Sequence, residues 1–345
     1  MINLEQIQNE IAAEAAAFIS QSNARSPWGE ISAKYLIESA PTEISALLEP
    51  ILPRVGVAAL VGSSDSGKST FLRGLAMAVS SGQQLYAGFR LSPLHQSAIY
   101  VSTEDDQNSV AALLKRQNTE LQLDTSLYDN LRFVFDSDNI ITKLDNMLSA
   151  RAADLVIVDA FSDIYTGSLN ENNQVRGFLQ EFHDIAQRHQ CLILFLHHTG
   201  KRTESLTPSK HNAIGSQGFE AKMRLLIELR KDPRQGCEHL RHLCIVKGNY
   251  LAPTFKNASF ELRFSPHLNY FPTGNRIPFE ELRERTDDDL RMSEQIAKAL
   301  SLQQSGMPLT QIAKQLGIPR TTLSDRLKRG AVADDVDGCD GRTDY

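Results

Sequence analysis

Continuous apolar runs alternate with amphipathic stretches through the middle of the chain, over residues 51–265. Runs in which nearly every position is apolar are typical of strands buried on both faces of a sheet, whereas apolar residues spaced by three and four positions predict helices. The predicted strands are 55–62, 97–105, 131–135, 153–160, 191–198 and a hairpin of 223–230 with 242–249, and the predicted helices are 70–82, 107–118, 138–150 and 173–189. This alternation indicates an α/β fold with a parallel sheet covered on both faces.

The pattern changes on both sides of this region. An amphipathic helix is expected over residues 1–20, with an apolar stripe that must pack against its own or a neighbouring subunit. The expected organisation is an N-terminal helix and linker (1–50), the α/β domain (51–265), a polar linker (266–292), a module of short helices (293–330) and an acidic disordered tail (331–345).

Composition limits the classes of protein that fit. The chain has 345 residues with a net charge of −6, which excludes a wholly basic nucleic-acid coat but allows a local basic patch. Its four cysteines form no C-x-x-C pair, which argues against a structural zinc site and favours a reducing compartment. No signal-peptide pattern and no membrane-length apolar run is present, so we expect a cytoplasmic protein without membrane contact.

A glycine-rich segment follows the first strand. Residues 62–69, GSSDSGKS, match the pattern G-x-x-x-x-G-K-[ST] between an apolar strand and a helix, and the alternative is a chance Gly/Ser turn. Backbone N–H groups of such a loop wrap a phosphate chain, Lys68 would contact the β- and γ-phosphates of ATP, and Ser69 would be a ligand of Mg²⁺. The expected nucleotide-binding residues are Gly62, Ser63, Ser64, Asp65, Ser66, Gly67, Lys68, Ser69 and Thr70.

Polar residues end three other predicted strands: Asp159 after LVIV, Glu104 after AIYVST, and His197 with His198 after CLILFL. Parallel strands end at the edge of the sheet where the phosphate loop lies. Asp159 is therefore predicted to hold Mg²⁺ through water, Glu104 to polarise the attacking water, and His198 to contact the γ-phosphate. The alternatives are a strand-end turn for Asp159, a helix-capping acid for Glu104 and a satisfied edge residue for one histidine.

Together these motifs resemble the RecA-like ATPases, specifically the plasmid RepA-type hexameric replicative helicases. Residues 214–218 (IGSQG) are similar to that family's R-G-S-S segment and residues 247–253 (KGNYLAP) to its K-x-N-Y-G-x-P segment, so the resemblance covers about residues 50–255. The chain departs from the family at Ile214, Gln217 and Leu251, which replace arginine, serine and glycine.

The resemblance implies a RecA-like P-loop NTPase core that forms a homo-hexamer or another ring with ATP at each subunit interface. It also implies that Glu104 activates water, that His198 links the γ-phosphate to a DNA-binding loop, and that a basic residue of the next subunit completes the site. The identity of that residue stays open between Arg224, Arg230 and Lys247, each of which has a solvated strand-end charge as its alternative.

The loop after His198 carries Lys201, Arg202 and Lys210 against Glu204. In a ring such a loop faces the pore and tracks the backbone of single-stranded DNA. The loop over residues 163–173 is a second pore candidate, and the alternative for both is a mobile surface loop.

Residues 308–330 predict a helix-turn-helix, because Ala313, Gly317 and Leu323 keep the usual offsets of four and six. The stretch resembles the DNA-binding ends of resolvases and invertases, which implies that its second helix enters the major groove of duplex DNA. The expected contacts are Arg320, Thr321, Thr322, Ser324 and Arg326. The alternative is a module used for protein contacts or ring packing.

Two functions follow from these observations. The leading one is an ATP-hydrolysing DNA motor, a helicase, in plasmid or mobile-element replication. The second is a non-motor ATPase that assembles on DNA as a regulator or as a transposition or replication accessory protein. Basic residues in the loop after His198 favour the motor, and a dedicated duplex-binding module favours the second function.

Overall fold

The computed structural model describes residues 30–39, 43–200, 203, 205–213, 217–283 and 287–330. The chain divides into two units, residues 1–45 and residues 46–345. In the described part of the first unit, helix α2 (Ala33–Ser39) buries none of its residues. The helix expected over residues 1–20 and the acidic tail expected over 331–345 lie outside the described residues.

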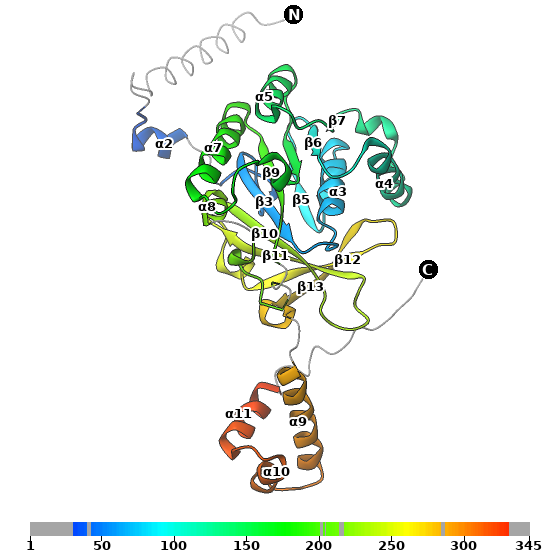
Figure 1. Ribbon diagram of the computed structural model, residues 1–345, viewed down its shortest axis with the longest axis vertical. Coiled ribbons are helices and arrows are strands. Elements are labelled where there is room, and N and C mark those ends of the chain that lie inside the picture. The colour runs from blue at the N-terminus through cyan, green and yellow to red at the C-terminus, as the bar shows by residue number, and fades with distance from the viewer. Residues whose placement is uncertain are drawn as a thin grey trace, which may run out of the picture. The chain divides into compact units, whose positions relative to one another are not determined.

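A nine-stranded sheet in the order β13-β12-β11-β10-β3-β9-β8-β6-β7 forms the centre of the second unit (Figure 1). The strands from β10 to β7 in this order are parallel, and β11, β12 and β13 continue the sheet antiparallel. The strands are β3 (Gly56–Gly62), β6 (Ala98–Ser102), β7 (Leu131–Val134), β8 (Leu155–Asp159), β9 (Leu192–His198), β10 (Leu225–Lys231), β11 (Leu240–Gly248), β12 (Ala258–Phe264) and β13 (Tyr270–Pro278). The predicted α/β class with a parallel central sheet is confirmed.

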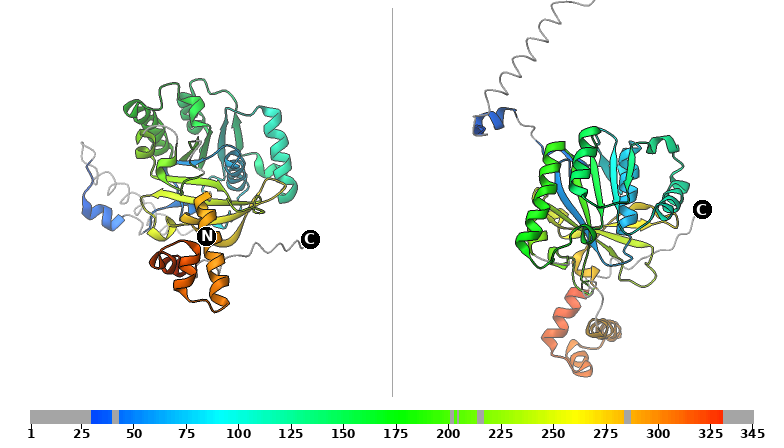
Figure 2. Two further views of the ribbon diagram at one scale, coloured as in Figure 1. Left: turned by 60° about the horizontal axis from the view of Figure 1, so that its bottom comes forward. Right: turned by 45° about the horizontal axis from the view of Figure 1, so that its top comes forward.

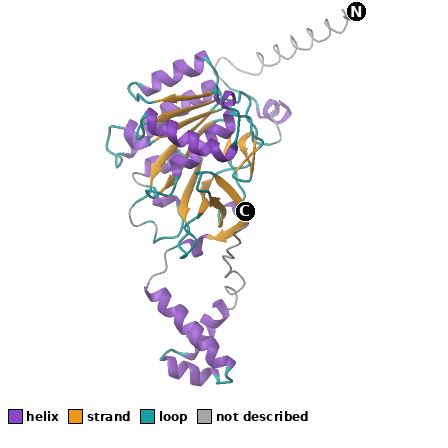
Figure 3. Ribbon diagram, turned by 90° about the vertical axis from the view of Figure 1, so that its right-hand side faces the viewer, coloured by secondary structure: helices purple, strands orange, loops and turns teal. Residues whose placement is uncertain are grey.

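Helices cover both faces of this sheet, so the strands form the middle layer (Figures 2 and 3). On one face, α3 packs Leu72 and Leu75 into the core, and on the other α5 and α7 contribute Leu144 and Phe182. The helices are α3 (Lys68–Ser80), α4 (Gln107–Leu121), α5 (Ile140–Ala150), α6 (Phe161–Ile164), α7 (Asn172–His189) and α8 (Gln217–Lys222). Burial on both faces is why the central strands are continuously apolar in sequence.

A second, four-stranded sheet in the order β2-β1-β5-β4 lies in the same unit. Its strands are β1 (Ala46–Glu49), β2 (Leu52–Pro53), β4 (Leu85–Tyr86) and β5 (Phe89–Leu91). Leu47 and Leu48 of β1 are fully buried in the core that includes α3, so the expectation of a linker up to residue 50 was wrong for residues 46–49. Pro50 and Pro53 interrupt the apolar residues of this segment, so it shows no continuous strand pattern in sequence.

The segment 266–292, expected as a linker, also differs. It contains the edge strand β13, which pairs with β12 and buries Tyr270 and Ile277, followed by the short helix η4 (Phe279–Leu282) with Phe279 and Leu282 buried. Most of β13 is exposed, because an edge strand has one neighbour and little cover. That exposure gives the segment the polar composition that suggested a linker.

The predicted short helices near the C-terminus are present. They are α9 (Asp287–Gln304), α10 (Leu309–Leu316) and α11 (Arg320–Gly330), and they share a core of Ala299, Ile312, Ala313 and Leu323. Gly317 ends α10 in the left-handed conformation with φ of 66°, which favours glycine. Of the helices that the structure describes, none is both long and apolar enough to cross a membrane.

The buried side chain of Asp154 accepts hydrogen bonds from the backbone N–H groups of Leu94, His95 and Ser97, at 2.6–3.3 Å, just before β6 begins. We expect Asp154→Ala to lower the free energy of unfolding by about 1–3 kcal/mol, because these donors lose their acceptor. Urea unfolding measures the change. Asp129→Ala, at an exposed position, is the control and should change stability by less than about 0.5 kcal/mol. Equal effects of the two variants would contradict this role of Asp154.

Candidate nucleotide-binding site

The phosphate-loop sequence forms a turn from the end of β3 into α3. Gly67 has φ of 92°, in the left-handed region, and a side chain there would collide with the Tyr270 hydroxyl. A side chain on Gly62 would collide with the carbonyl oxygen of Leu229 on the adjacent strand β10. Both glycines of the motif are therefore required by the packing around the loop.

Side chains bind the carbonyl groups of this loop. The Lys68 ammonium donates to the carbonyl of Ser63 at 2.6 Å, and the Arg241 guanidinium Nε donates to that of Ser66 at 3.0 Å. The Tyr270 hydroxyl donates to the carbonyl of Gly67 at 2.9 Å. With carbonyls held on the protein side, peptide N–H groups of the loop can face an anion.

Lys68 lies among acidic groups. Burial lowers the pKa of its ammonium, and the negative charges of Asp159, Glu104 and Asp65 oppose that change in this order. The residue predicted to contact phosphates and the two acids predicted to serve hydrolysis are thus gathered at one edge of the sheet.

Asp159 ends β8 with only 5% of its surface exposed. Its Oδ2 accepts a hydrogen bond from the Tyr100 hydroxyl at 2.6 Å, while its buried Oδ1 has no hydrogen-bond partner among the described residues. Burial raises the pKa of Asp159, and the hydroxyls of Tyr100 and Ser69 oppose the rise. A carboxylate oxygen without a partner beside a serine hydroxyl is the hard-oxygen donor set that suits Mg²⁺.

Glu104 and His198 face each other. The His198 Nε2 lies 3.5 Å from Glu104 Oε1, and both side chains are partly exposed. The next backbone N–H, of Thr199, donates to the carbonyl of Gly62 at 3.1 Å and so ties the end of β9 to the phosphate loop. His197 is buried against the rings of Phe161 and Phe219, so the histidine at the open edge is His198.

The three basic candidates for action on a neighbouring subunit differ in environment. Arg230 is 5% exposed, pairs with Glu228 at 3.0 Å and donates to the carbonyls of Leu206 and Leu282. It was therefore a wrong candidate, because its guanidinium is enclosed by its own subunit. Lys247 is mostly buried, 2.9 Å from Glu220.

Arg224 is the exposed candidate. It lies just before β10, where its guanidinium donates to the exposed Tyr250 hydroxyl at 3.3 Å.

The predicted DNA contacts fall into two groups. Lys201 and Arg202 lie outside the described residues, and Lys210 in the short helix η2 (Lys210–Asn212) is 3.6 Å from Glu220. Arg320, Thr321, Thr322, Ser324 and Arg326 all belong to α11. Arg320 and Thr321 are exposed there, whereas Thr322 and Ser324 are half-buried.

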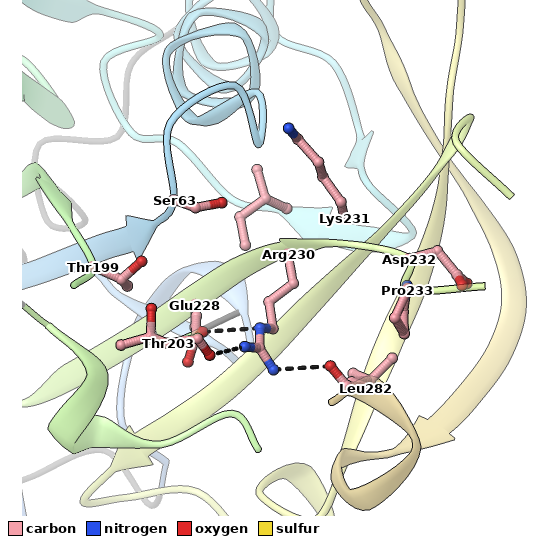
Figure 4. Close-up of a pocket in the computed structure, with 10 residues that line it drawn as sticks. Ser63, Thr199, Thr203, Glu228, Arg230, Lys231, Asp232, Pro233 and Leu282 are labelled. Carbon is pink, nitrogen blue, oxygen red and sulfur yellow. Dashed lines mark hydrogen bonds and ion pairs between the residues drawn. The ribbon is translucent and has the colours of Figure 1, made fainter. Parts of the chain in front are cut away.

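Sequence reasoning missed several residues that shape the site. Tyr100, Arg241 and Tyr270 support the loop and Asp159 from strands far apart in the sequence, and no spacing pattern links them to the motif. A cavity of about 210 Å³ beside the loop is lined by Ser63, Thr199 and the end of β10, including Lys231 (Figure 4). Its position could be found only from the pairing of β10 with β3.

A family model described as "AAA domain" matches residues 30–204, just over half of the chain. A solved structure of an ATPase domain is similar with a TM-score of 0.51 and 12% identity, over 77% of this chain and 98% of that chain. The structure entitled "Crystal structure of the RadB recombinase" has a TM-score of 0.45 and 16% identity, over 63% of this chain and 90% of that chain. No curated protein matches the chain in sequence. The fold is that of a RecA-like P-loop ATPase.

Glu104→Gln should leave ATP binding within about threefold of the wild type and lower the hydrolysis rate by roughly a hundredfold or more, since the amide keeps the shape but cannot accept the proton of water. Nucleotide binding and phosphate release measure the two effects. The control is Asp105→Asn, at the next position in the chain. Normal turnover in Glu104→Gln would remove this residue from the role of base.

Proposed function

This chain belongs to the AAA domain family, and we propose that it is an ATP-driven DNA motor whose active sites form between subunits of a ring, as in the RepA-type helicases that its sequence resembles. The observation that carries the proposal is the division of the site between two edges of the sheet. The phosphate loop, Glu104 and His198 lie at one edge, and the exposed arginine candidate lies at the other.

Within one subunit, the residues at the carboxyl edge have complementary tasks. Glu104 accepts a proton from the water that attacks the γ-phosphorus. The bond between the γ-phosphorus and the oxygen that bridges it to the β-phosphate breaks, and this oxygen leaves with ADP. Ser69 and Asp159 would hold Mg²⁺, which neutralises phosphate charge when it is bound. The contact of His198 with Glu104 supports a role for this pair in detecting the γ-phosphate.

Arg224 is positioned to act on the next subunit. In the parallel pairing of β10 with β3, Leu225 lies level with Ala58, four residues before Gly62. At about 3.3 Å per residue, Arg224 is roughly 15 Å along the sheet from its own phosphate loop. A basic residue at that distance cannot contact ATP in its own subunit. In a ring it can contact ATP that is bound to the neighbouring subunit.

DNA would be handled in two places. The loop that follows His198 carries Lys201, Arg202 and Lys210, and its direct connection to that histidine supports coupling of DNA contact to the nucleotide. The second place is α11, whose exposed Arg320 and Thr321 follow a two-helix turn at Gly317. We propose that α11 binds duplex DNA through Arg320, Thr321, Thr322, Ser324 and Arg326.

The domain boundaries proposed for this function follow the described elements. The ATPase domain runs from β1 to η4, residues 46–282, and the helical module occupies residues 287–330. The separate core of the helical module favours one alternative, a non-motor ATPase that assembles on duplex DNA as a regulator or accessory protein.

A strand-displacement assay with ATP separates the motor from the non-motor ATPase. We expect displacement in parallel with hydrolysis. ATP hydrolysis stimulated by duplex DNA without displacement would favour the non-motor ATPase. Particle imaging under the same conditions reports whether the protein forms closed rings or filaments on the duplex.

Arg224→Ala should lower turnover by roughly a thousandfold, because an arginine that acts in trans stabilises the transition state. Mixing this variant with Lys68→Ala should restore part of the activity, since some interfaces join an intact phosphate loop to an intact Arg224. Phosphate release from mixtures of varied ratio is the measurement. Arg176→Ala, an exposed position on α7, is the control and should be near the wild type. Loss of activity without rescue would contradict action across the interface.

Arg320→Glu in the full chain should weaken binding of duplex DNA by roughly tenfold or more, because a positive contact to DNA becomes repulsive. Fluorescence anisotropy with labelled duplex at fixed salt measures the change. Lys298→Glu, at an exposed position of α9, reverses the same charge and is the control. If both variants lose the same affinity, the effect reports net charge and α11 is no specific reader of DNA.

A further inference from the structure

The last residue of β10, Lys231, is a cation beside the phosphate loop that the sequence motifs do not include. Leu229, two residues earlier, packs its carbonyl against Gly62, and Glu228 lies level with Val61. Lys231 thus continues the strand about 7 Å past Leu229, alongside the turn of the phosphate loop.

The alternation of β10 fixes the face on which Lys231 lies. Leu225, Ile227 and Leu229 belong to the core that α3 shares, whereas Leu226 belongs to the core on the opposite face. Because side chains of a strand alternate between faces, Lys231 falls on the face of α3, the helix that the phosphate loop opens. Figure 4 shows its side chain rising from the strand toward that loop.

Two neighbouring residues on the same face donate hydrogen bonds to carbonyl groups of the phosphate loop. Arg241, directly opposite Lys231 in the β10–β11 pairing, binds the carbonyl of Ser66, and Tyr270 of β13 binds that of Gly67. Lys231 is exposed, and among the described residues no hydrogen bond or ion pair engages its ammonium.

The acidic residues nearest to Lys231 in sequence form ion pairs with other basic side chains. Asp232 accepts from Arg234 at 2.6 Å and pairs with His242 at 2.9 Å, and Glu228 pairs with Arg230 at 3.0 Å. Asp232, His242 and Glu261 lie close enough together to be candidate metal ligands. Arg234 also pairs with Glu261 at 3.2 Å, so its guanidinium bridges the two carboxylates of this group. These acids are therefore paired with other cations, and the ammonium of Lys231 can bind an anion that is not part of the protein.

The field of Lys231 reaches the phosphate-binding lysine. Burial lowers the pKa of Lys68, and the positive charge of Lys231 lowers it further. Ser63, whose carbonyl binds the Lys68 ammonium, lines the same cavity as Lys231. The Lys68 ammonium and the cavity that Lys231 lines therefore meet at Ser63, the first residue of the loop after Gly62.

We propose that Lys231 is a further phosphate-binding residue of the ATP site, supplied by the same subunit as the phosphate loop, and that it contacts the terminal phosphate and so favours ATP over ADP. This proposal rests on the proposed function as an ATPase. A cation beyond Lys68 gains its partner only when a third phosphate is present, whereas Lys68 and the loop N–H groups bind both nucleotides.

The first test compares binding of ATPγS and of ADP to the full-length protein with Mg²⁺, by titration calorimetry. Lys231→Ala should weaken ATPγS by about ten- to a hundredfold, as for loss of a charged hydrogen bond, and ADP by less than about threefold. Lys231→Arg should keep most of the preference. Lys115→Ala, an exposed lysine of α4, is the control and should bind both nucleotides normally.

Equal weakening of both nucleotides, or no change, would overturn the proposal. Failure of the wild type to bind either nucleotide would instead overturn the proposed ATPase function. A second test asks which subunit Lys231 serves: Lys231→Ala mixed with Lys68→Ala should show no rescue of hydrolysis, because each variant is defective in its own site. Rescue of the kind expected for Arg224→Ala would mean that Lys231 acts on the neighbour, and would overturn action in cis.

Discussion

The conformation of the phosphate loop depends on hydrogen bonds to its carbonyl groups. Lys68, Arg241 and Tyr270 bind the carbonyls of Ser63, Ser66 and Gly67, from α3, β11 and β13. Two of these donors come from the antiparallel extension of the sheet, far beyond the motif in sequence. The extension therefore supports the loop: Arg241 donates to the Ser66 carbonyl, and Tyr270 donates to the Gly67 carbonyl, which also accepts from the Phe71 N–H of α3 at 2.9 Å. Tyr270 also sets the requirement for glycine at position 67, since its hydroxyl fills the space of a side chain there.

A second set of bonds links the nucleotide edge to the segments that would carry DNA contacts. Thr199 binds the carbonyl of Gly62, and the other end of the same loop is held where Glu228 accepts from Ser209 and Asn212. Arg230, paired with Glu228, binds the carbonyls of Leu206 and Leu282. One buried ion pair thus holds both the loop after β9 and the end of the ATPase domain. Arg230 therefore has a structural role in its own subunit. Its position as a charged residue at the end of a predicted strand was the reason that the sequence made it a candidate for action on a neighbouring subunit.

The parallel half of the fold, the hairpin of β10 with β11 and the positions of the residues at the carboxyl edge were predictable, whereas β12, β13 and the small sheet were not. Continuous apolar strands and the spacing of Gly62, Lys68 and Ser69 are local signals, and the strand ends at Glu104, Asp159 and His198 follow from parallel topology. By contrast, β13 is an edge strand with a polar sequence, and β1 is a short strand that Pro50 ends. Arg230 and Arg224 cannot be told apart in sequence, since each is a basic residue at an end of the same predicted strand. Arg230 is buried because the fold brings Glu228, Leu206 and Leu282 around it.

The carboxyl edge of the sheet carries several negative charges, which a bound nucleotide must overcome. The carboxylates of Asp159, Glu104 and Asp65 surround Lys68, and each opposes the effect of burial on its pKa. A triphosphate adds further negative charge to this edge, so binding and hydrolysis need cations beyond Lys68. In the proposed site, Mg²⁺ held by Ser69 and Asp159 and the ammonium of Lys231 would supply part of this positive charge within one subunit. Glu104 and His198, which are proposed to serve hydrolysis, are partly exposed at this edge. In the proposed ring, a guanidinium of another subunit would supply the remaining positive charge, whereas Arg224 of the same chain is held at the opposite edge by the direction of β10.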